Sequence, residues 1–386
     1  MHALLKNKTN SSIQMFIDAS NIGSGGGISH LKNLLERAPL DKKCYTIWVD
    51  KSFIKILPKK ENFTYKTSIF FKLSAPMKIF WKIFIFRTIC FFNKPDVIFC
   101  PGGLLFFKHP NSVINFQNIL PFVDLTNDSA GFFEIIKNNI LRRLLFFSAS
   151  SSTKHIFHSH NSKKIIYSHN LESKKNSVIY HGIDNEFLIE KSRFQQRIEQ
   201  FEKKMRNREP LNFSYVSSAY KYKNHTQLLE IFVALKKKSI PYNLNLIISD
   251  GPFKKNILKT IHDFQLRDKV TIFENLDKKN LISILHDETD IGLFVSSFET
   301  FGIILAEKMA SGLPIFCTKS SCIPEILENH NLYLDLNDID SSVDKILNDL
   351  NDVEKIIYNC NSSLIRAKEF SWENSAKMSW DFILSK

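Results

Sequence analysis

The sequence predicts an α/β protein with two Rossmann-like domains that face a cleft, and three observations carry this prediction. The 386 residues fit two or three domains at roughly 150 residues each. Short apolar runs alternate with helical runs at spacings of 20–30 residues, which is typical of parallel βαβ units. A highly charged stretch without strand signals, residues 186–210, divides the chain into two such series. Ligands of these folds bind at the carboxyl ends of the strands.

The first series begins with an apolar run at 13–19, which is bounded by turn residues and predicts a strand. A Gly-rich turn at 21–27 follows, and Leu31, Leu34 and Leu35 then recur at helical spacing. Further strands are expected at 45–49, 96–100, 112–116, 155–158 and 177–180, and helices at 75–92 and 131–147.

The second series alternates more regularly. Strands are expected at 212–216, 244–249, 270–273, 290–295 and 313–316. They alternate with helices at 224–237, from 253 to about 264, and at 279–286, 302–310 and 323–327. This strict alternation favours a second parallel sheet.

The net charge of +13 is unevenly distributed. Residues 1–200 hold 28 Lys and Arg against 14 Asp and Glu, a net of +14, whereas residues 201–386 hold 24 against 25, a net of −1. The excess indicates an anionic partner of the first half. Basic residues are scattered, and no zinc-finger, helix-turn-helix or RNA-binding signature is present, so a nucleic acid is not expected as a partner.

The most apolar stretch is residues 79–92, IFWKIFIFRTICFF. It is too short and too interrupted by Lys82 and Arg87 for a transmembrane span. A helix lying against a bilayer and a helix buried in its domain both remain open. Residues 1–12 lack the apolar core of a signal peptide. The six cysteines form no CxxC pair, which favours buried, reduced thiols in a cytosolic protein.

Three motifs carry candidate chemistry. Residues 23–27, GSGGG, would let a backbone approach an anion at a helix N-terminus, although a tight turn explains them equally well. Lys223 precedes the helix at 224–237 and fits either a phosphate site or a solvated lysine. Glu299 and Glu307 lie eight residues apart across a strand-end loop and its helix, where carboxylates accept hydrogen bonds from paired hydroxyls. A helix cap and a surface residue are the alternative interpretation of these two.

The block at residues 298–318, FETFGIILAEKMASGLPIFCT, closely resembles the E-x7-E signature of retaining GT-B glycosyltransferases, specifically glycosyltransferase family 4 (glycosyl transferases group 1). The Gly-rich first loop, VIYHGID, SYVSSAYKYKNH and LIISDGP follow in the family's order, so the resemblance covers nearly the whole chain. It implies an acceptor-binding domain at 1–185, a linker at 186–210 and a nucleotide-sugar-binding domain at 211–369. Residues 370–386 resemble the helix that packs back on the first domain.

The resemblance also implies a role for each matching residue. Glu299 would hold hydroxyls of the donor sugar, and Lys223 would stabilise the diphosphate, so both are expected in catalysis. Gln117 stands where many members have a His, and it is expected to orient the sugar or the acceptor without acting as a base. Asn118 is expected on the acceptor side, and Glu307 at the ribose hydroxyls. The other expected donor-binding residues are Gly25, Gly26, Gly27, Ser218, Lys221, Gly251, Phe301, Gly302 and Ile303.

Another of these positions departs from the family, as Gln117 does. Ser218 occupies a place where an Arg is common, and Lys221 is the expected substitute. No Asp-x-Asp metal site is evident, so no metal or other cofactor is expected, and Lys223 with the helix N-termini would stabilise the leaving diphosphate.

The implied reaction transfers a sugar, with retention, from a nucleoside-diphosphate sugar to a lipid-linked or polysaccharide acceptor in bacterial O-antigen, lipopolysaccharide or capsule synthesis. The expected partners are this donor, the acceptor and an anionic membrane. The expected location is cytoplasmic, peripheral on the inner face of the cytoplasmic membrane, which the basic, Phe-rich stretches at 70–94 and 137–147 support. The alternatives are a GT-B epimerase or phosphorylase, and a non-catalytic protein that binds membranes or nucleic acid.

Overall fold

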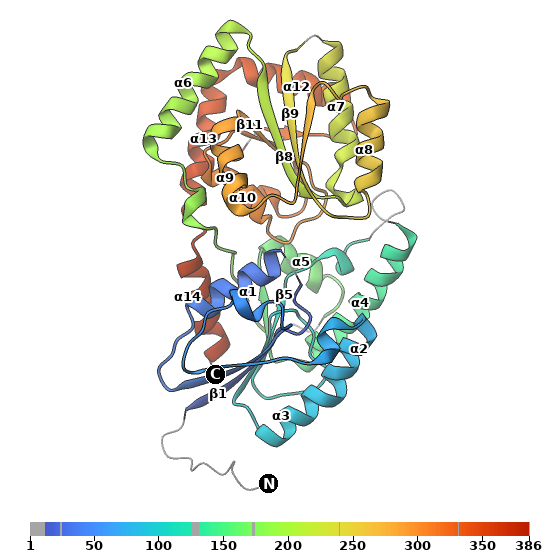
Figure 1. Cartoon of the computed structure of the whole chain (residues 1–386), viewed down its shortest axis with the longest axis vertical. Coiled ribbons are helices and arrows are strands. Elements are labelled where there is room, and N and C mark those ends of the chain that lie inside the picture. The colour runs from blue at the N-terminus through green and yellow to red at the C-terminus, as the bar shows by residue number, and fades with distance from the viewer. Residues whose placement is uncertain are drawn as a thin grey trace.

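The computed structural model describes residues 12–23, 25–124, 131–171, 174–238, 240–330 and 332–385. Two α/β domains lie one above the other, the first below and the second above in Figure 1. The sheet of the first domain has seven parallel strands in the order β3-β2-β1-β4-β5-β6-β7, and that of the second has six, in the order β10-β9-β8-β11-β12-β13. The predicted fold class is therefore confirmed. Residues 1–11, which make up most of the segment examined for a signal peptide, lie outside the described residues.

The strands follow the predicted apolar runs closely. The first sheet contains β1 (Ile13–Asp18), β2 (Lys43–Trp48), β3 (Phe63–Lys66), β4 (Val97–Cys100), β5 (Ser112–Phe116), β6 (Lys154–Phe157) and β7 (Lys175–Val178). The second contains β8 (Leu211–Ser218), β9 (Tyr242–Ser249), β10 (Val270–Glu274), β11 (Ile291–Phe294), β12 (Ile315–Thr318) and β13 (Tyr333–Leu334). The edge strands β3 and β13 are not among the predicted strands, because β3 is half exposed and β13 has only two residues.

The helices cover both faces of each sheet. The first domain contains α1 (Gly26–Glu36), α2 (Ala75–Phe80), α3 (Arg87–Asn93), α4 (Phe132–Ser151) and α5 (His160–Tyr167). The second contains α6 (Lys191–Asn207), α7 (His225–Lys237), α8 (Lys254–Asp263), α9 (Lys278–Ser283), α10 (Ile303–Ala310), α11 (Ile323–Leu327), α12 (Ile339–Asn351) and α13 (Val353–Ala367). Two π-helical turns, η3 (Trp81–Phe86) and η7 (Ile284–Glu288), continue α2 and α9, and the short 3-10 turns include η6 (Lys221–Lys223).

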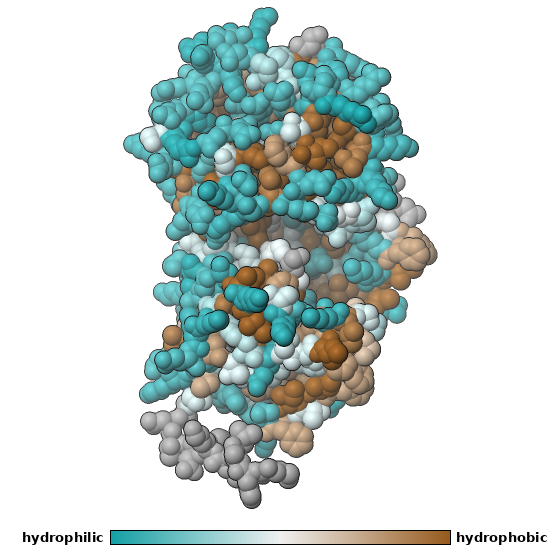
Figure 2. Space-filling view, viewed as in Figure 1, coloured by the Kyte–Doolittle hydropathy of each residue, from teal (hydrophilic) through white to brown (hydrophobic). Residues whose placement is uncertain are grey.

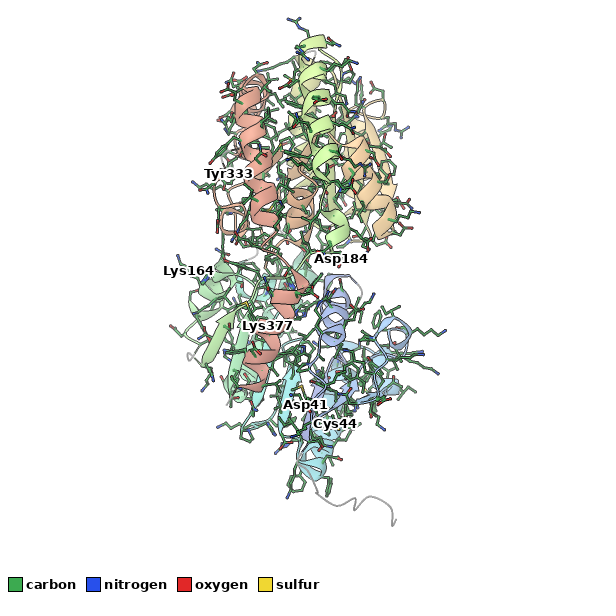
Figure 3. The ribbon with its side chains drawn as sticks, turned by 90° about the vertical axis from the view of Figure 1, so that its left-hand side faces the viewer. Asp41, Cys44, Lys164, Asp184, Tyr333 and Lys377 are labelled. Atoms are coloured by element: carbon green, nitrogen blue, oxygen red, sulfur yellow. The ribbon has the colours of Figure 1, made fainter. Side chains whose placement is uncertain are left out.

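The last helix, α14 (Trp372–Leu384), returns to the first domain, where it runs down beside that domain (Figure 3). Its Trp380 is buried, and the indole N–H donates a hydrogen bond to the carbonyl oxygen of Leu34 at 2.8 Å. Ala376 and Ile383 join the same core. Most of the stretch expected as a linker forms the helix α6, whose buried face packs into the second domain.

Residues 79–92 lie in the helical segment α2–η3–α3, which has one buried face and one exposed face. Trp81 and Phe86 are buried, whereas Phe91 and Phe92 are 72% and 75% exposed. Lys82 is also buried, where it forms an ion pair with Asp18 at the end of β1. This ion pair holds the segment against the sheet while the opposite face stays open. Among the described residues, no helix combines the length and apolar composition that crossing a bilayer requires.

The cysteines follow the prediction with one exception. Cys90, Cys100, Cys317, Cys322 and Cys360 are buried and free, and burial raises the pKa of each thiol. Cys44 is exposed, so the expectation of burial is wrong there. In the pattern of β2, the side chain of Cys44 alternates with the buried Tyr45 and points to the open side.

Candidate active site

The two carboxyl edges of the sheets meet through the loop that joins β11 to α10. Thr300 in this loop donates a hydrogen bond from Oγ1 to the carbonyl oxygen of Gln117 at 3.1 Å, and its own carbonyl accepts one from Ser159 Oγ at 2.6 Å. Gln117 follows β5, and Ser159 caps α5, so both partners belong to the first domain. The contacts bring the strand ends of both domains to one place.

Glu299 and Lys223 form an ion pair at this place. Their side chains are only 16% and 12% exposed, which places both charges in a largely water-excluded setting. Lys223 comes from η6, directly after β8 and before α7, so both residues lie at carboxyl ends of neighbouring strands. The backbone of Glu299 is fixed by Ser321, which accepts a hydrogen bond from its N–H at 3.1 Å and donates one to its carbonyl at 2.8 Å.

Glu307 lies one turn inside α10, with its carboxyl group buried. Its Oε2 has no hydrogen-bond partner among the described residues. Burial is the main cause that raises the pKa of Glu307 to about 8, with a further rise from Asp184 and an opposing effect of Lys278. A buried carboxyl oxygen without a partner has a strong demand for donors, which hydroxyl groups of a ligand can meet.

The glycines that open α1 and α10 face each other across the domains. Gly25 and Gly302 both have positive φ angles, 84° and 85°, which favour glycine, and both stand at the N-cap of their helix. A Cβ atom at Gly26 would lie 3.3 Å from Ile303 Cδ1, so the Gly-rich loop packs directly against the first turn of α10. Two helix N-termini, each favourable to an anion, therefore border the same space.

Gln117 and Asn118 lie beside the Gly-rich loop, with different constraints. The side-chain amide of Gln117 lies 3.1 Å from the Nδ1 atom of His30, and a Cβ atom at Gly27 would approach Gln117 Oε1 to 3.1 Å. Asn118 is exposed, and its Oδ1 accepts the backbone N–H of Leu120 at 2.9 Å. Gln117 is therefore held in place at the domain junction, whereas Asn118 shapes the following turn.

The remaining expected donor residues lie in the same region but face it differently. Ser218 ends β8, and Lys221 begins η6, two residues before Lys223. Gly251 packs on the second domain's own backbone, because a Cβ atom there would lie 2.3 Å from the carbonyl oxygen of Ala219. The ring of Phe301 is buried against Phe370 and His181, so only its backbone is available to a ligand.

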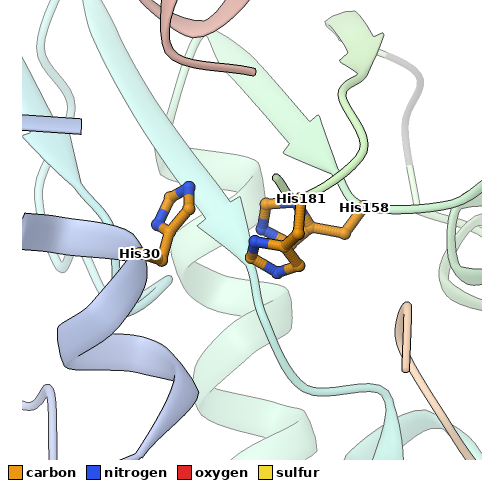
Figure 4. Close-up of side chains that lie close together, drawn as sticks. All are labelled: His30, His158 and His181. Carbon is orange, nitrogen blue, oxygen red and sulfur yellow. The ribbon is translucent and has the colours of Figure 1, made fainter. Parts of the chain in front are cut away.

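The first domain contains a cluster of three buried histidines that is not predicted from the sequence: His30, His158 and His181 (Figure 4). One ring nitrogen of each lies within 4.8 Å of the others, which is close enough to suggest metal binding. However, the rings of His158 and His181 stack with centroids 3.7 Å apart and planes inclined by 23°. Because the lone pair of an imidazole lies in the ring plane, stacked rings do not point at a common ion, and the arrangement does not fit a metal site.

The three imidazoles are instead kept neutral. Burial lowers the pKa of His158 to about 4, and burial together with the neighbouring imidazoles holds the pKa of His30 and of His181 well below the ordinary value of 6.5. His30 contacts Gln117, and His181 contacts Phe301 next to Gly302. The cluster therefore lies under the junction of the domains. In the sequence, two features hint at this cluster. One is His30, three residues after the Gly-rich loop, and the other is His181 in VIYHGID.

Comparison with known proteins identifies a family and several relatives that this chain resembles. The family described as "Glycosyl transferases group 1" matches residues 196–360. The chain is 26% identical over 175 residues to the O-antigen chain mannosyltransferase RfbU of Salmonella typhimurium (strain LT2), a match that covers 45% of this chain and 44% of the relative. It is 34% identical over 82 residues to the O-antigen chain mannosyltransferase B of Escherichia coli, covering 21% and 22%. The chain thus matches less than half the length of these curated relatives.

Solved structures match over almost the entire chain. WaaG, a glycosyltransferase involved in lipopolysaccharide biosynthesis, superposes with a TM-score of 0.67 at 12% identity and covers 97% of this chain and 100% of that one. Anabaena Alr3699/HepE, solved in complex with UDP and glucose, has a TM-score of 0.67 at 15% identity and covers 95% and 98%. The chain therefore has the GT-B fold, and most of its second domain matches the family described as glycosyl transferases group 1.

Proposed function

We propose that the protein is a retaining glycosyltransferase of glycosyltransferase family 4, which moves a sugar from a nucleoside-diphosphate sugar to a lipid-linked or polysaccharide acceptor of a bacterial surface glycan. One observation carries the proposal: the Lys223–Glu299 ion pair and the unpartnered carboxyl of Glu307 lie where two helix N-termini meet. The named relatives, two O-antigen mannosyltransferases and the lipopolysaccharide enzyme WaaG, support the surface-glycan part.

The ion pair and the helix N-termini suit a diphosphate leaving group. As the bond to the anomeric carbon breaks, negative charge grows on the diphosphate. The ammonium of Lys223 and the amides at the starts of α1 and α10 would stabilise this charge in a desolvated setting. Glu299, released from Lys223, would then accept hydrogen bonds from hydroxyls of the transferred sugar. No metal is required by this arrangement, and Lys221 would add charge where Ser218 stands in place of an Arg.

The buried carboxyl group of Glu307 is suited to accept hydrogen bonds from the ribose hydroxyls of the donor nucleotide. Two vicinal hydroxyls donating to one carboxylate favour its ionised form, so binding would draw the proton from a group whose pKa is about 8. Gln117, held by His30 and Thr300, would orient the sugar or the acceptor. A carboxamide does not titrate, so Gln117 takes no part in proton transfer.

An exposed aromatic surface of the first domain supports a lipid-linked acceptor and a peripheral location on the inner face of the cytoplasmic membrane. We define the Phe-rich surface as the exposed aromatic residues of α2–η3–α3 and α4. They are Phe80, Phe84, Phe91, Phe92, Phe132, Phe133 and Phe147. Exposed Arg87, Lys94, Lys137 and Arg143 are interspersed among them. Figure 2 shows hydrophobic atoms gathered on the side of the first domain that carries these helices. Exposed aromatic groups among cations are typical of proteins that rest on an anionic bilayer.

A donor panel with mass detection tests the function. The purified protein is incubated with individual nucleoside-diphosphate sugars and a lipid-diphosphate-linked sugar, and the product mass and anomeric configuration are determined. We expect one donor to add one sugar with retained configuration and to raise the melting temperature when it is added alone. A panel in which no nucleotide sugar stabilises the protein and none is consumed contradicts the proposal.

A further inference from the structure

A cavity of about 230 Å³ lies at the carboxyl edge of the first sheet, beside Gln117. Its polar lining consists of four carboxamide side chains together with backbone at glycines, and no charged side chain of the residues that the structure describes lines it. The four carboxamides belong to Asn21, Asn115, Gln117 and Asn118. Apolar contacts come from Phe116, Leu141 and Leu145 on one side. The cavity therefore offers many hydrogen bonds and no formal charge.

The amide of Asn115 is the most unusual group in this cavity. Asn115 is 1% exposed, and neither its Oδ1 nor its Nδ2 has a hydrogen-bond partner among the described residues. A buried polar group that has no hydrogen-bond partner destabilises the folded protein. Asn21 shows half of the same pattern, because its Nδ2 donates to the carbonyl of Gly102 at 2.8 Å while its Oδ1 has no partner among those residues. A ligand that both donates and accepts hydrogen bonds would satisfy both amides.

The orientation of Gln117 follows from the neutral state of His30. Since burial lowers the pKa of His30 well below its usual value, its Nδ1 can accept a hydrogen bond, and the Nε2 amide of Gln117 donates it. The Oε1 atom of Gln117 then remains an acceptor on the side of Gly27. Because the backbone carbonyl of Gln117 also binds Thr300, the rim of the cavity lies next to Glu299.

We propose that this cavity receives one uncharged sugar ring, the terminal unit of the acceptor, an inference that rests on the proposed function. Each carboxamide pairs a donor with an acceptor, which matches a hydroxyl group, whereas a phosphate or carboxylate would find no cation among the described residues that line the cavity. The volume equals that of roughly eight molecules of liquid water at ~30 Å³ each, on the scale of one monosaccharide. Phe116, Leu141 and Leu145 would contact the C–H face of the ring.

The test compares the wild type with Asn115→Leu, a replacement with the same branching pattern that removes both amide groups. Binding of methyl α-D-mannopyranoside, methyl α-D-glucopyranoside and methyl β-D-glucuronide is followed by ligand-observed NMR, and melting temperatures are measured with and without the donor. We expect the wild type to bind an uncharged glycoside in preference to the glucuronide. We expect Asn115→Leu to weaken this binding at least tenfold, to melt no lower than the wild type, and to keep its stabilisation by the donor.

The matched control is Ser214→Ala. Ser214 is fully buried in β8 of the second domain, its hydroxyl also lacks a partner among the described residues, and it lies away from the cavity. This variant should bind glycosides as the wild type does. The inference is overturned if no uncharged glycoside binds the wild type, if the glucuronide binds best, or if Asn115→Leu binds glycosides normally. It is also overturned if Asn115→Leu loses the donor effect, because the cavity would then belong to the donor.

These outcomes separate the inference from the proposed function. Failure of every nucleotide sugar to stabilise the wild type would contradict the proposed function, while the glycoside measurements would still report on the cavity.

Discussion

Glu325 of the second domain accepts a hydrogen bond from the hydroxyl of Tyr180 of the first at 2.9 Å. The same carboxylate also accepts the backbone N–H groups of His160 and Asn161, at 2.6 and 2.8 Å, and so caps the N-terminus of α5. A charged acceptor on free amides at a helix start is among the stronger hydrogen-bonding arrangements. Glu325 therefore joins the domains at a point separate from the E-x7-E loop.

Replacing Glu325 with Ala should loosen this junction. Hydrogen bonds to a charged group contribute about 1.5–3 kcal/mol each, so we expect a clear loss of stability and a larger radius of gyration in small-angle scattering. Glu328→Ala is the control, since Glu328 is half exposed and pairs only with Arg366 among the described residues. If Glu325→Ala keeps the wild-type dimensions and melting temperature, the junction depends on other contacts.

Removing either partner of the Lys223–Glu299 ion pair should nearly abolish sugar transfer. Lys223→Ala and Glu299→Ala are each expected to lower kcat by a factor of roughly 100 or more, because stabilisation of the leaving group in a desolvated site is worth several kcal/mol. Circular dichroism should show the fold intact. Lys236→Ala, which removes an exposed ion pair with Asp268, should leave activity unchanged. Near-normal transfer by both site variants contradicts the assignment.

Donor binding should strengthen as the pH rises towards 8. In the free protein the pKa of Glu307 is about 8, and the bound ribose hydroxyls favour the ionised carboxylate. Below that pH, binding must release a proton, so the Kd should rise about tenfold for each pH unit below the pKa. Calorimetry in buffers of different ionisation enthalpy measures this release directly. The Glu307→Gln variant should bind weakly with no such slope, and a wild-type Kd independent of pH between 6 and 9 excludes the role.

The histidine cluster should make the fold sensitive to acid. An unfolded histidine binds a proton below its ordinary pKa of 6.5, whereas buried His158 does so only near 4. Between these values the unfolded state binds more protons, so the free energy of unfolding decreases as the pH falls from 6.5 to 4. Each unit of pKa difference corresponds to about 1.4 kcal/mol. We expect His158→Phe, which keeps a stacked ring, to reduce this slope, and His262→Phe on the surface to leave it unchanged.

The Phe-rich surface should bind anionic vesicles in a salt-sensitive manner. The double variant Phe91→Ser, Phe92→Ser should bind vesicles of mixed phosphatidylglycerol and phosphatidylcholine several-fold more weakly in sedimentation assays, because both rings are largely exposed. Ile365→Ser removes an equally exposed apolar side chain from the second domain and serves as the control. Binding that is absent, or indifferent to salt and to both variants, contradicts a peripheral membrane role.

The sequence reveals those features that depend on neighbouring residues. Apolar runs and turn residues predict the central strands, and Gly302 marks the turn between Glu299 and α10. The histidine cluster and the Glu325 junction escape prediction because they join residues far apart in the chain, which only the strand order brings together. Gly251 shows the opposite case: its place in a family motif suggests a ligand, whereas its close contact with Ala219 already requires a glycine.

The return of α14 to the first domain has a consequence for folding during synthesis. Ala376, Trp380 and Ile383 of α14 belong to a core whose other buried residues all come from the N-terminal half, such as Leu34. A ribosome delivers the N-terminal half first, yet this core stays open until residue 383 has left the exit tunnel. The second domain can therefore reach its native packing before the first one closes. The nascent first domain meanwhile presents an apolar groove that chaperones would be expected to cover.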